Sequence, residues 1–312
     1  MPKSALIAIG GNSLIRAGEK GTIAEQLANT RRTAHAIVKL MQAGYEVVVT
    51  HGNGPQVGAA LIRSERASDQ VYGHPLDVCD ATTQGEIGYL LQQSLYNELA
   101  QHSGIHPVVT VVSQVVVSAA DPAMQKPTKP VGPFYSREAA EEKQHALGWQ
   151  IVEDAARGWR RVVPSPEPLE IVEEGIIKTL LAQGVLVIAV GGGGIPVVRE
   201  GKTLKGIEAV IDKDRASALL AARLKVDTFV ISTDAQFVCL DYKKPTQKNL
   251  SKVTVAELEG YYKAGHFPPG NMGPKVESAL RFLKAGGREC LITSYEHLVD
   301  AVLGSGGTRI VP

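Results

Sequence analysis

Cysteine is scarce in this chain, which has only three cysteines in 312 residues. Cys79, Cys239 and Cys290 lie far apart in the sequence and form no C-x-x-C pair. An odd number of widely spaced cysteines is not the pattern of a secreted, disulfide-stapled protein. We therefore expect reduced thiols and no disulfide framework.

Long apolar runs and an excess of charge of one sign are also missing. No stretch approaches the ~18 consecutive apolar residues that a membrane span requires, and the N-terminal "MPKSALIAIGG" is too short for a secretory signal. Lys plus Arg total 33 against 32 Asp plus Glu, so the formal net charge is +1. This balance argues against nucleic-acid and membrane partners. We expect a soluble, cytoplasmic protein whose positive sites are local.

The common phosphate and metal motifs are absent as well. The segment most similar to a P-loop contains Gly201-Lys202-Thr203, but Pro196 occupies the position of the first glycine in the G-x-x-x-x-G-K-[ST] motif. There is no H-R-D or D-F-G set of a protein kinase, and none of the eight histidines has H-E-x-x-H spacing. We predict no zinc and no protein-bound metal. The segment "GHPLDVCD", with His74, Asp77, Cys79 and Asp80, favours loop and capping roles over a metal site.

The sequence that is present alternates short apolar runs with helical patterns, and 44% of it is hydrophobic. An amphipathic segment at 25–44, which ends at Gly44, predicts a helix. Strands followed by helices in this way predict an α/β fold with a doubly wound parallel sheet and helices on both faces. The runs predicted as buried strands are 5–9, 45–50, 106–113, 185–190, 228–233 and 289–294.

One region interrupts the alternation. From Asp121 onward the chain is rich in proline and charge, as in "DPAMQKPTKPVGPFYSREAAEEKQ". A long surface excursion and a functional lid both fit this composition, because long segments without regular structure often carry function. We interpret residues 121–163 as a small protruding lid subdomain inserted in a single domain that spans 1–312.

Three glycine-rich loops follow predicted strands: "AIGGNSL", "THGNGPQVG" and "AVGGGGIPV". Carboxyl ends of parallel strands are where open α/β sheets bind ligands, and glycine lets backbone N–H groups approach an anion. Each loop alone fits a tight turn, but three at one sheet edge predict a phosphate site. The candidate residues are Gly10, Gly11, Asn12, Gly52, Asn53, Gly54, Gly191, Gly192 and Gly193.

Three lysines stand at positions that need an explanation. Lys213 and Lys275 lie in the first turns of predicted helices, where the helix dipole disfavours a cation. Lys129 lies between prolines in the predicted lid, from which it could reach a site. Phosphoryl transfer depends on cations aimed at the transferring group, so these lysines are candidate catalytic residues.

In order along the chain, "AIGGNSL", "THGNGPQVG", "PTKPVGPFY", "RRVVPSPEP", "AVGGGGIPV", "AVIDKD" and "GNMGPKV" resemble the carbamate kinases of the amino-acid-kinase superfamily. The resemblance implies a three-layer αβα sandwich with a mainly parallel eight-stranded sheet, a protruding lid and a homodimer. It also implies reversible phosphoryl transfer from ATP with Mg²⁺ to carbamate, giving ADP and carbamoyl phosphate. Net flow toward ATP, in arginine or related nitrogen catabolism, is the direction expected for the family.

The same resemblance implies roles for single residues. Lys213 and Lys275 would neutralise the transferring phosphoryl group, Asp214 would orient both lysines, and Lys129 would reach carbamate from the lid. Asp234 and Tyr242, in "STDAQFVCLDYKKP", would lie near the base or ribose. The chain departs from the family pattern at Asn271 and at Ala235-Gln236, which leaves the nucleotide contacts least defined.

Two other functions fit the same residues. Another acyl-phosphate-forming kinase of this fold would need an added specificity element, such as an arginine pair, and "GWRRVV" offers Arg160 and Arg161 within the predicted lid. A non-catalytic nucleotide-binding module would not need Lys213, Asp214 and Lys275. Turnover of carbamoyl phosphate with ADP separates these alternatives.

Overall fold

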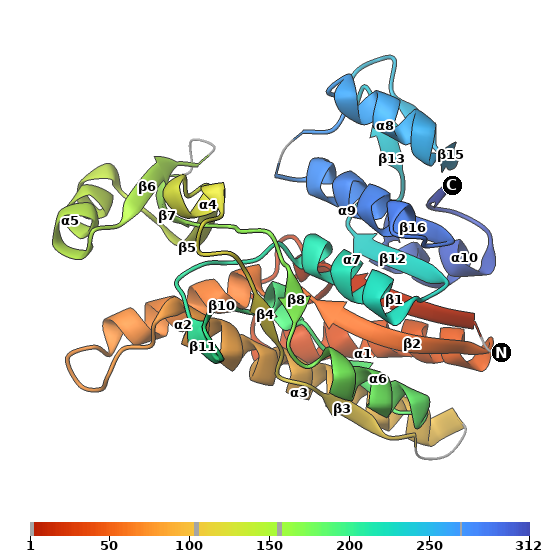
Figure 1. Cartoon of the computed structure of the whole chain (residues 1–312), viewed down its shortest axis with the longest axis horizontal. Helices are drawn as coiled ribbons and strands as arrows, with labels where there is room; N and C mark the ends of the chain where they lie inside the picture. Colours follow the sequence, from red (N-terminus) through yellow and green to blue (C-terminus); the bar gives the residue numbers. More distant parts are fainter. Residues whose placement is uncertain (1–2, 103–105, 155–157, 269) are drawn as a thin grey trace.

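An eight-stranded sheet forms the centre of the computed structural model, which describes residues 3–102, 106–154, 158–268 and 270–312 (Figure 1). Its strand order is β15-β17-β16-β12-β1-β2-β9-β3, and neighbouring strands are parallel except β16 with β17. The predicted α/β class and mainly parallel sheet are confirmed. The strands are β1 (Lys3–Ile9), β2 (Tyr45–His51), β3 (Val108–Thr110), β9 (Leu186–Ile188), β12 (Thr228–Thr233), β15 (Lys252–Thr254), β16 (Glu289–Ser294) and β17 (Thr308–Val311).

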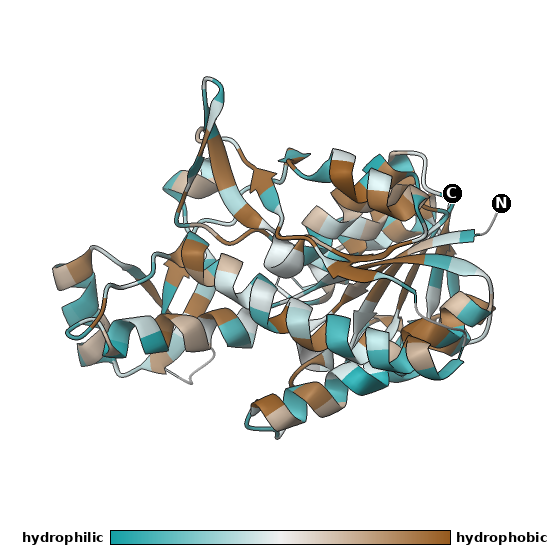
Figure 2. Cartoon of the chain, turned by 90° about the horizontal axis from the view of Figure 1, so that it is seen from below, coloured by the Kyte–Doolittle hydropathy of each residue, from teal (hydrophilic) through white to brown (hydrophobic). Residues whose placement is uncertain are grey.

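Helices cover both faces of this sheet. Along β1, Ile7 and Ile9 belong to one buried cluster, while Leu6 and Ala8 belong to the other. Figure 2 shows the hydrophobic colour concentrated on the strands between the helical layers. The three-layer αβα arrangement is therefore confirmed. One layer contains α1 (Ile23–Gln42), α3 (Leu76–His102) and α10 (Leu298–Leu303), and the other contains α6 (Glu174–Ala182), α7 (Lys213–Leu224), α8 (Val255–Lys263) and α9 (Met272–Lys284).

Local sequence signals explain where the predicted helix at 25–44 begins and ends. Thr22 and Glu25 form a capping box at the start of α1, which satisfies backbone N–H groups of its first turn. The chain leaves the helix at Gly44, whose φ of 89° is the left-handed conformation that glycine adopts without strain. Among the described residues, no helix combines the length and apolarity needed to cross a bilayer.

The strand predicted at 106–113 is shorter than expected. β3 ends at Thr110, and the chain then enters a second sheet of order β11-β10-β4-β8. Between the two sheets, the side chain of Gln84 holds the backbone at Ser113, accepting from Ser113 N at 2.8 Å and donating to Ser113 O at 3.1 Å. Ser113 O also accepts from Ile195 N of β10 at 2.9 Å, so the chain has already turned toward the second sheet there. The second sheet contains β4 (Gln114–Val116), β8 (Glu170–Ile171), β10 (Ile195–Glu200) and β11 (Thr203–Gly206).

Residues 121–163 leave the main body and extend to one side (Figure 1). We call them the projecting segment. Their core is a three-stranded antiparallel sheet of order β5-β7-β6, with α5 packed beside it. The composition that interrupts the α/β pattern therefore folds into structure of its own. Its elements are α4 (Pro122–Gln125), β5 (Lys129–Tyr135), α5 (Arg137–Leu147), β6 (Gln150–Glu153) and β7 (Trp159–Val163).

Candidate functional site

The first two glycine-rich loops meet at the carboxyl ends of β1 and β2. Gly10 N donates to Ser232 O at 3.0 Å, and a Cβ at Gly10 would lie 2.9 Å from that oxygen. A Cβ at Gly52 would lie 3.2 Å from Gly11 N. Glycine is therefore needed here because the backbones of neighbouring strand ends nearly touch.

The third loop packs onto the second. It begins at Val190, whose φ of 52° is a left-handed conformation that costs energy for a branched residue, and forms the short 3-10 helix η2 (Gly191–Gly193). A Cβ at Gly192 would lie 2.3 Å from Asn53 Nδ2, and one at Gly191 would lie 2.4 Å from His51 Nε2. The three loops thus form one compact floor, as their positions after parallel strands predict.

A cavity of about 780 Å³ opens above this floor. It lies between the loops, the projecting segment and the first turns of α7 and α9. Gly10, Gly11, Gly191 and Gly193 do not line it, and the side chain of Asn12 lies outside the described part of the structure. The predicted residues that line it are Gly52, Asn53, Gly54, Lys129, Gly192, Lys213, Asp214 and Lys275.

Two lysines share one aspartate at the wall of this cavity. Lys213 Nζ lies 2.7 Å from Asp214 Oδ1, and Lys275 Nζ lies 3.2 Å from Asp214 Oδ2. Asp214 is only 3% exposed. The helix α7 that carries Lys213 and Asp214 is fixed against the sheet by a buried hydrogen bond of 2.7 Å between Thr50 Oγ1 and Ser217 Oγ.

The charges in this cluster shift one another's pKa values. Burial alone would raise the pKa of Asp214, but the two ammonium groups outweigh it and lower that pKa. Burial also lowers the pKa of Lys213, helped by the positive charge of Lys275 and opposed by Asp214. For Lys275, burial is outweighed by the attraction of Asp214, so its pKa is raised. The aspartate is therefore ionised between two lysines whose pKa values shift in opposite directions.

Lys213 Nζ is buried, and apart from Asp214 Oδ1 at 2.7 Å it has no hydrogen-bond acceptor among the described residues. An ammonium group has three N–H donors, and leaving donors unpaired in a buried position is costly unless a ligand supplies acceptors. Three lysines line the cavity against two carboxylates, those of Asp212 and Asp214. The arrangement can therefore bind an anion and stabilise negative charge at a chosen point.

The predicted nucleotide residues lie in a second, smaller cavity. Asp234 and Tyr242 line a space of about 160 Å³ together with Phe267 and Met272. Asn271, at the start of α9, lines both cavities. A ligand that occupied the smaller cavity with one end could thus extend into the larger one.

The amino acid kinase family model matches residues 3–294 of the chain. The chain belongs to this family. It is 51% identical to a carbamate kinase of Thermococcus kodakarensis, over 99% of both chains. It is 46% identical to the carbamate kinase-like protein YahI of Escherichia coli, over 100% of this chain and 99% of that protein. The resemblance that the motifs predict is confirmed.

A solved structure is similar along almost the whole length of this kinase. The carbamate kinase from Giardia lamblia bound to AMP-PNP superimposes with a TM-score of 0.95 at 46% identity, covering 99% of this chain and 98% of that chain. The amino-acid-kinase fold, which the resemblance implied, is therefore confirmed. The AMP-PNP complex also ties the fold to nucleotide binding in that relative.

Asp212 is a residue of this kinase that the sequence reasoning missed. Its Oδ1 caps α7 by accepting from Asp214 N at 3.0 Å and from Arg215 N at 3.3 Å. Its Oδ2 accepts from Lys129 Nζ at 3.0 Å, which ties the projecting segment to the cavity. The signal was present in "AVIDKD", where an aspartate directly before a helix is a typical N-cap.

A second missed residue is Asp80, at the start of α3. Asn53 Nδ2 donates to Asp80 Oδ1 at 3.0 Å and to Thr83 Oγ1 at 2.9 Å, which fixes the orientation of the Asn53 side chain. Burial raises the pKa of Asp80 to about 8, although its bond to Asn53 acts in the opposite direction. Asp80 therefore supports the second loop instead of joining a metal site with Cys79, whose thiol faces the backbone oxygen of His74.

Two further polar residues, His51 and Lys202, lie near glycines but carry no charge into the larger cavity. His51, at the end of β2, is buried, and burial lowers its pKa to about 4, so the imidazole is neutral. Lys202, in the P-loop-like segment, is exposed in the turn between β10 and β11 and lines neither cavity. The predicted residues that line the larger cavity therefore do not include the P-loop-like segment around Lys202.

Proposed function

We propose that this protein is a carbamate kinase that catalyses ATP + carbamate = ADP + carbamoyl phosphate in both directions. The observation that carries the proposal is the pair of largely buried lysines, Lys213 and Lys275, which share the single carboxylate of Asp214 at the cavity wall. Full-length similarity to carbamate kinases supports the choice of substrate.

The reaction needs no protein base. A carbamate oxygen attacks the γ-phosphorus, the new O–P bond forms, and the bond from phosphorus to the bridging oxygen of ADP breaks. Carbamate is already an anionic nucleophile at neutral pH, so no proton has to be removed. The protein's task is to position two anions and neutralise charge as phosphorus is transferred.

The residues divide this task among them. Lys213 and Lys275 stabilise the transferring phosphoryl group, and Asp214 holds both ammonium groups in place. Lys129 binds carbamate from the projecting segment. Gly52 and Gly54 line the acceptor side, while Asn53, held by Asp80, shapes the loop between them. Gly192 of the third loop lines the phosphate side, and the loops of Gly10, Gly11, Asn12 and Gly191–Gly193 otherwise support that wall from behind, because Gly10 N and Gly193 N already donate to Ser232 O and Val190 O.

We propose that the nucleotide enters with Mg²⁺ bound to its phosphates. Both carboxylates that line the larger cavity, Asp212 and Asp214, are already bound by lysines. With these carboxylates occupied, Mg²⁺ would be held mainly by phosphate and water oxygens, which this hard cation prefers. When bound, the metal neutralises phosphate charge, and Asp234 and Tyr242 hold the nucleoside end.

We propose that the projecting segment acts as a lid. Carbamoyl phosphate is a mixed anhydride that water destroys, so covering the cavity protects it. Lys129 of β5 already reaches Asp212 across the opening. Deletion of residues 121–163 should leave ADP binding largely intact and abolish turnover, whereas equal loss of ADP affinity would place the segment in the core of the fold.

We also propose a homodimer. Tyr89 and Tyr96 lie two turns apart on one face of α3 and are 61% and 45% exposed. Exposed aromatic side chains on a shared helix face favour an interface. Light scattering of the wild type and of Tyr96→Lys tests this assignment, and a monomeric wild type would contradict it.

The decisive assay mixes the protein with ADP, Mg²⁺ and carbamoyl phosphate and follows ATP with a coupled enzyme. Acetyl phosphate in place of carbamoyl phosphate tests the alternative acyl-phosphate kinase. We expect ATP to form from carbamoyl phosphate, because carbamoyl phosphate is a stronger phosphoryl donor than ATP and the equilibrium therefore favours ATP. ADP binding by folded protein without ATP formation would instead support a binding module.

A further inference from the structure

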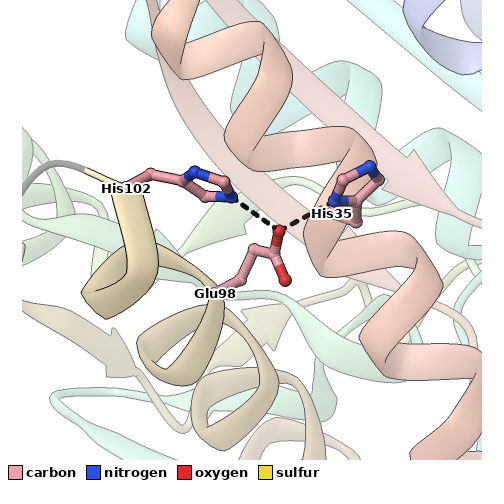
Figure 3. Close-up of side chains that lie close together, drawn as sticks. All are labelled: His35, Glu98 and His102. Carbon is pink, nitrogen blue, oxygen red and sulfur yellow. Dashed lines mark hydrogen bonds and ion pairs between the residues drawn. The ribbon is translucent and has the colours of Figure 1, made fainter.

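Two histidines and a glutamate meet on the surface between α1 and α3, on a face that the proposed kinase reaction does not use. His35 Nδ1 lies 2.7 Å from Glu98 Oε1, and His102 Nε2 lies 3.1 Å from the same oxygen (Figure 3). The three ligand atoms lie within 4.8 Å of one another. Both imidazole rings thus point at one carboxylate from two different helices.

The backbones that carry these side chains are fixed relative to one another. Thr30 Oγ1 and Ser94 Oγ form a buried contact of 3.0 Å between α1 and α3. Glu98 follows Ser94 by one turn of α3, and His102 follows Glu98 by another turn, so both project from one face. Because the helices are already packed, little backbone ordering would be needed to assemble a three-residue site.

Although the sequence motifs predict no zinc, we propose that His35, Glu98 and His102, which the fold brings together from two helices, bind a divalent transition-metal ion of the Zn²⁺ class. Two imidazole nitrogens and one carboxylate oxygen suit Zn²⁺, Ni²⁺ or Cu²⁺, whereas Mg²⁺ and Ca²⁺ prefer oxygen ligands alone. His35 Nδ1 and His102 Nε2 would bind through their lone pairs, each ring keeping its proton on the other nitrogen. Water completes the coordination, since the two histidine side chains are 52% and 38% exposed.

The position of the cluster indicates what the metal does. Asp80 and His102 lie on the same helix 22 residues apart, which corresponds to about 33 Å at 1.5 Å per residue. The site is therefore remote from the phosphoryl-transfer cavity. An ion there joins α1 to α3 and stabilises the fold, with no direct part in the kinase reaction.

The test titrates the full-length protein with Zn²⁺ and compares wild type with His35→Gln/His102→Gln. We expect the wild type to bind one more Zn²⁺ per chain than the double variant. At about 100 times Kd, Zn²⁺ should raise the wild-type Tm by about 4 °C, and this rise should be lost in the double variant. His145→Gln, which removes an exposed histidine of α5, should behave as wild type.

Two further measurements make the test specific. Co²⁺ as a probe should give tetrahedral absorption bands without thiolate charge-transfer bands, which excludes the cysteines as ligands. Kinase turnover of the double variant without added Zn²⁺ should equal that of wild type, which shows that it folds. The proposal would be overturned if Zn²⁺ bound to wild type and double variant with equal affinity and an equal Tm shift. It would also be overturned if the wild type bound no Zn²⁺ when Zn²⁺ was added up to about 100 times the protein concentration.

Discussion

Replacing Lys213 with methionine separates catalysis from stability more clearly than any other change in the site. The ammonium group is buried at the wall of the larger cavity, and in the proposed mechanism it stabilises the transferring phosphoryl group. Loss of one preorganised charge-stabilising donor typically costs about 2.7–4 kcal/mol of transition-state stabilisation, or a factor of about 10²–10³ in rate. We expect kcat of Lys213→Met to fall by this factor.

Stability should respond in the opposite way. Burial lowers the pKa of Lys213, and this lowering already includes the attraction of Asp214. A lowered lysine pKa means that folding disfavours the charged form relative to the neutral one. Methionine resembles the neutral side chain in length and bulk, and Asp214 keeps its contact with Lys275. The Tm of Lys213→Met should therefore hold or rise.

The assay is ATP formation from ADP, Mg²⁺ and carbamoyl phosphate, with Tm measured on the same preparations. Lys202→Met is the matched control, because Lys202 is exposed and lines neither cavity. Its turnover should be close to wild type. If Lys202→Met abolished turnover and Lys213→Met did not, the phosphate site would lie elsewhere. A drop of many degrees in the Tm of Lys213→Met would refute the electrostatic reasoning.

Three other changes test the supporting structure. Asp214→Asn leaves two buried ammonium groups without their shared anion, so it should cost about 3–5 kcal/mol and lower Tm by about 5–8 °C in thermal unfolding, along with turnover. The raised pKa of Asp80, about 8 against an ordinary 3.8, gives stability that is fully present below about pH 4 and is lost as pH rises toward 8. Asp80→Asn keeps an acceptor for Asn53 without that charge, so its Tm advantage over wild type should grow from pH 5 to pH 8, and a constant difference would contradict the shift. Gly192→Ala should lose about 1–3 kcal/mol of stability in denaturant unfolding, because φ is 69° and the added methyl group meets Asn53.

Apolar runs predicted six of the eight strands of the central sheet, because buried parallel strands read as continuous Val- and Ile-rich runs. The short strands β15 and β17, at one edge of that sheet, carry no such run and were not predicted from it. The run at 228–233 coincides with β12, and the run at 289–294 with β16. The strand predicted at 106–113 was too long because the chain turns at 111–113 toward the second sheet, where Gln84 of α3 and Ile195 of β10, both distant in sequence, hold Ser113. Contacts between segments so far apart in sequence have no local signature.

The candidate site was predictable to a similar extent. Lys213 and Lys275 could be singled out because a cation in the first turn of a helix is unfavourable without a purpose. Asp80 could not, because its importance comes from burial under Asn53, which only the packing of α3 against the second loop creates. The glycines behind the cavity were predicted to bind phosphate. At Gly10 and Gly193 the structure gives another reason for glycine, because a Cβ there would lie within 3.0 Å of a backbone oxygen.

The two oxygens of Asp212 face different neighbours, and this limits what can replace the residue during evolution. Serine, threonine or asparagine could still cap α7 but would leave the Lys129 ammonium without an anion. Glutamate would keep the charge but is a poor cap, since its longer side chain does not match the geometry of the first turn. A random substitution at position 212 therefore fails in one place or the other, so we expect sequence drift in this protein to leave the position unchanged.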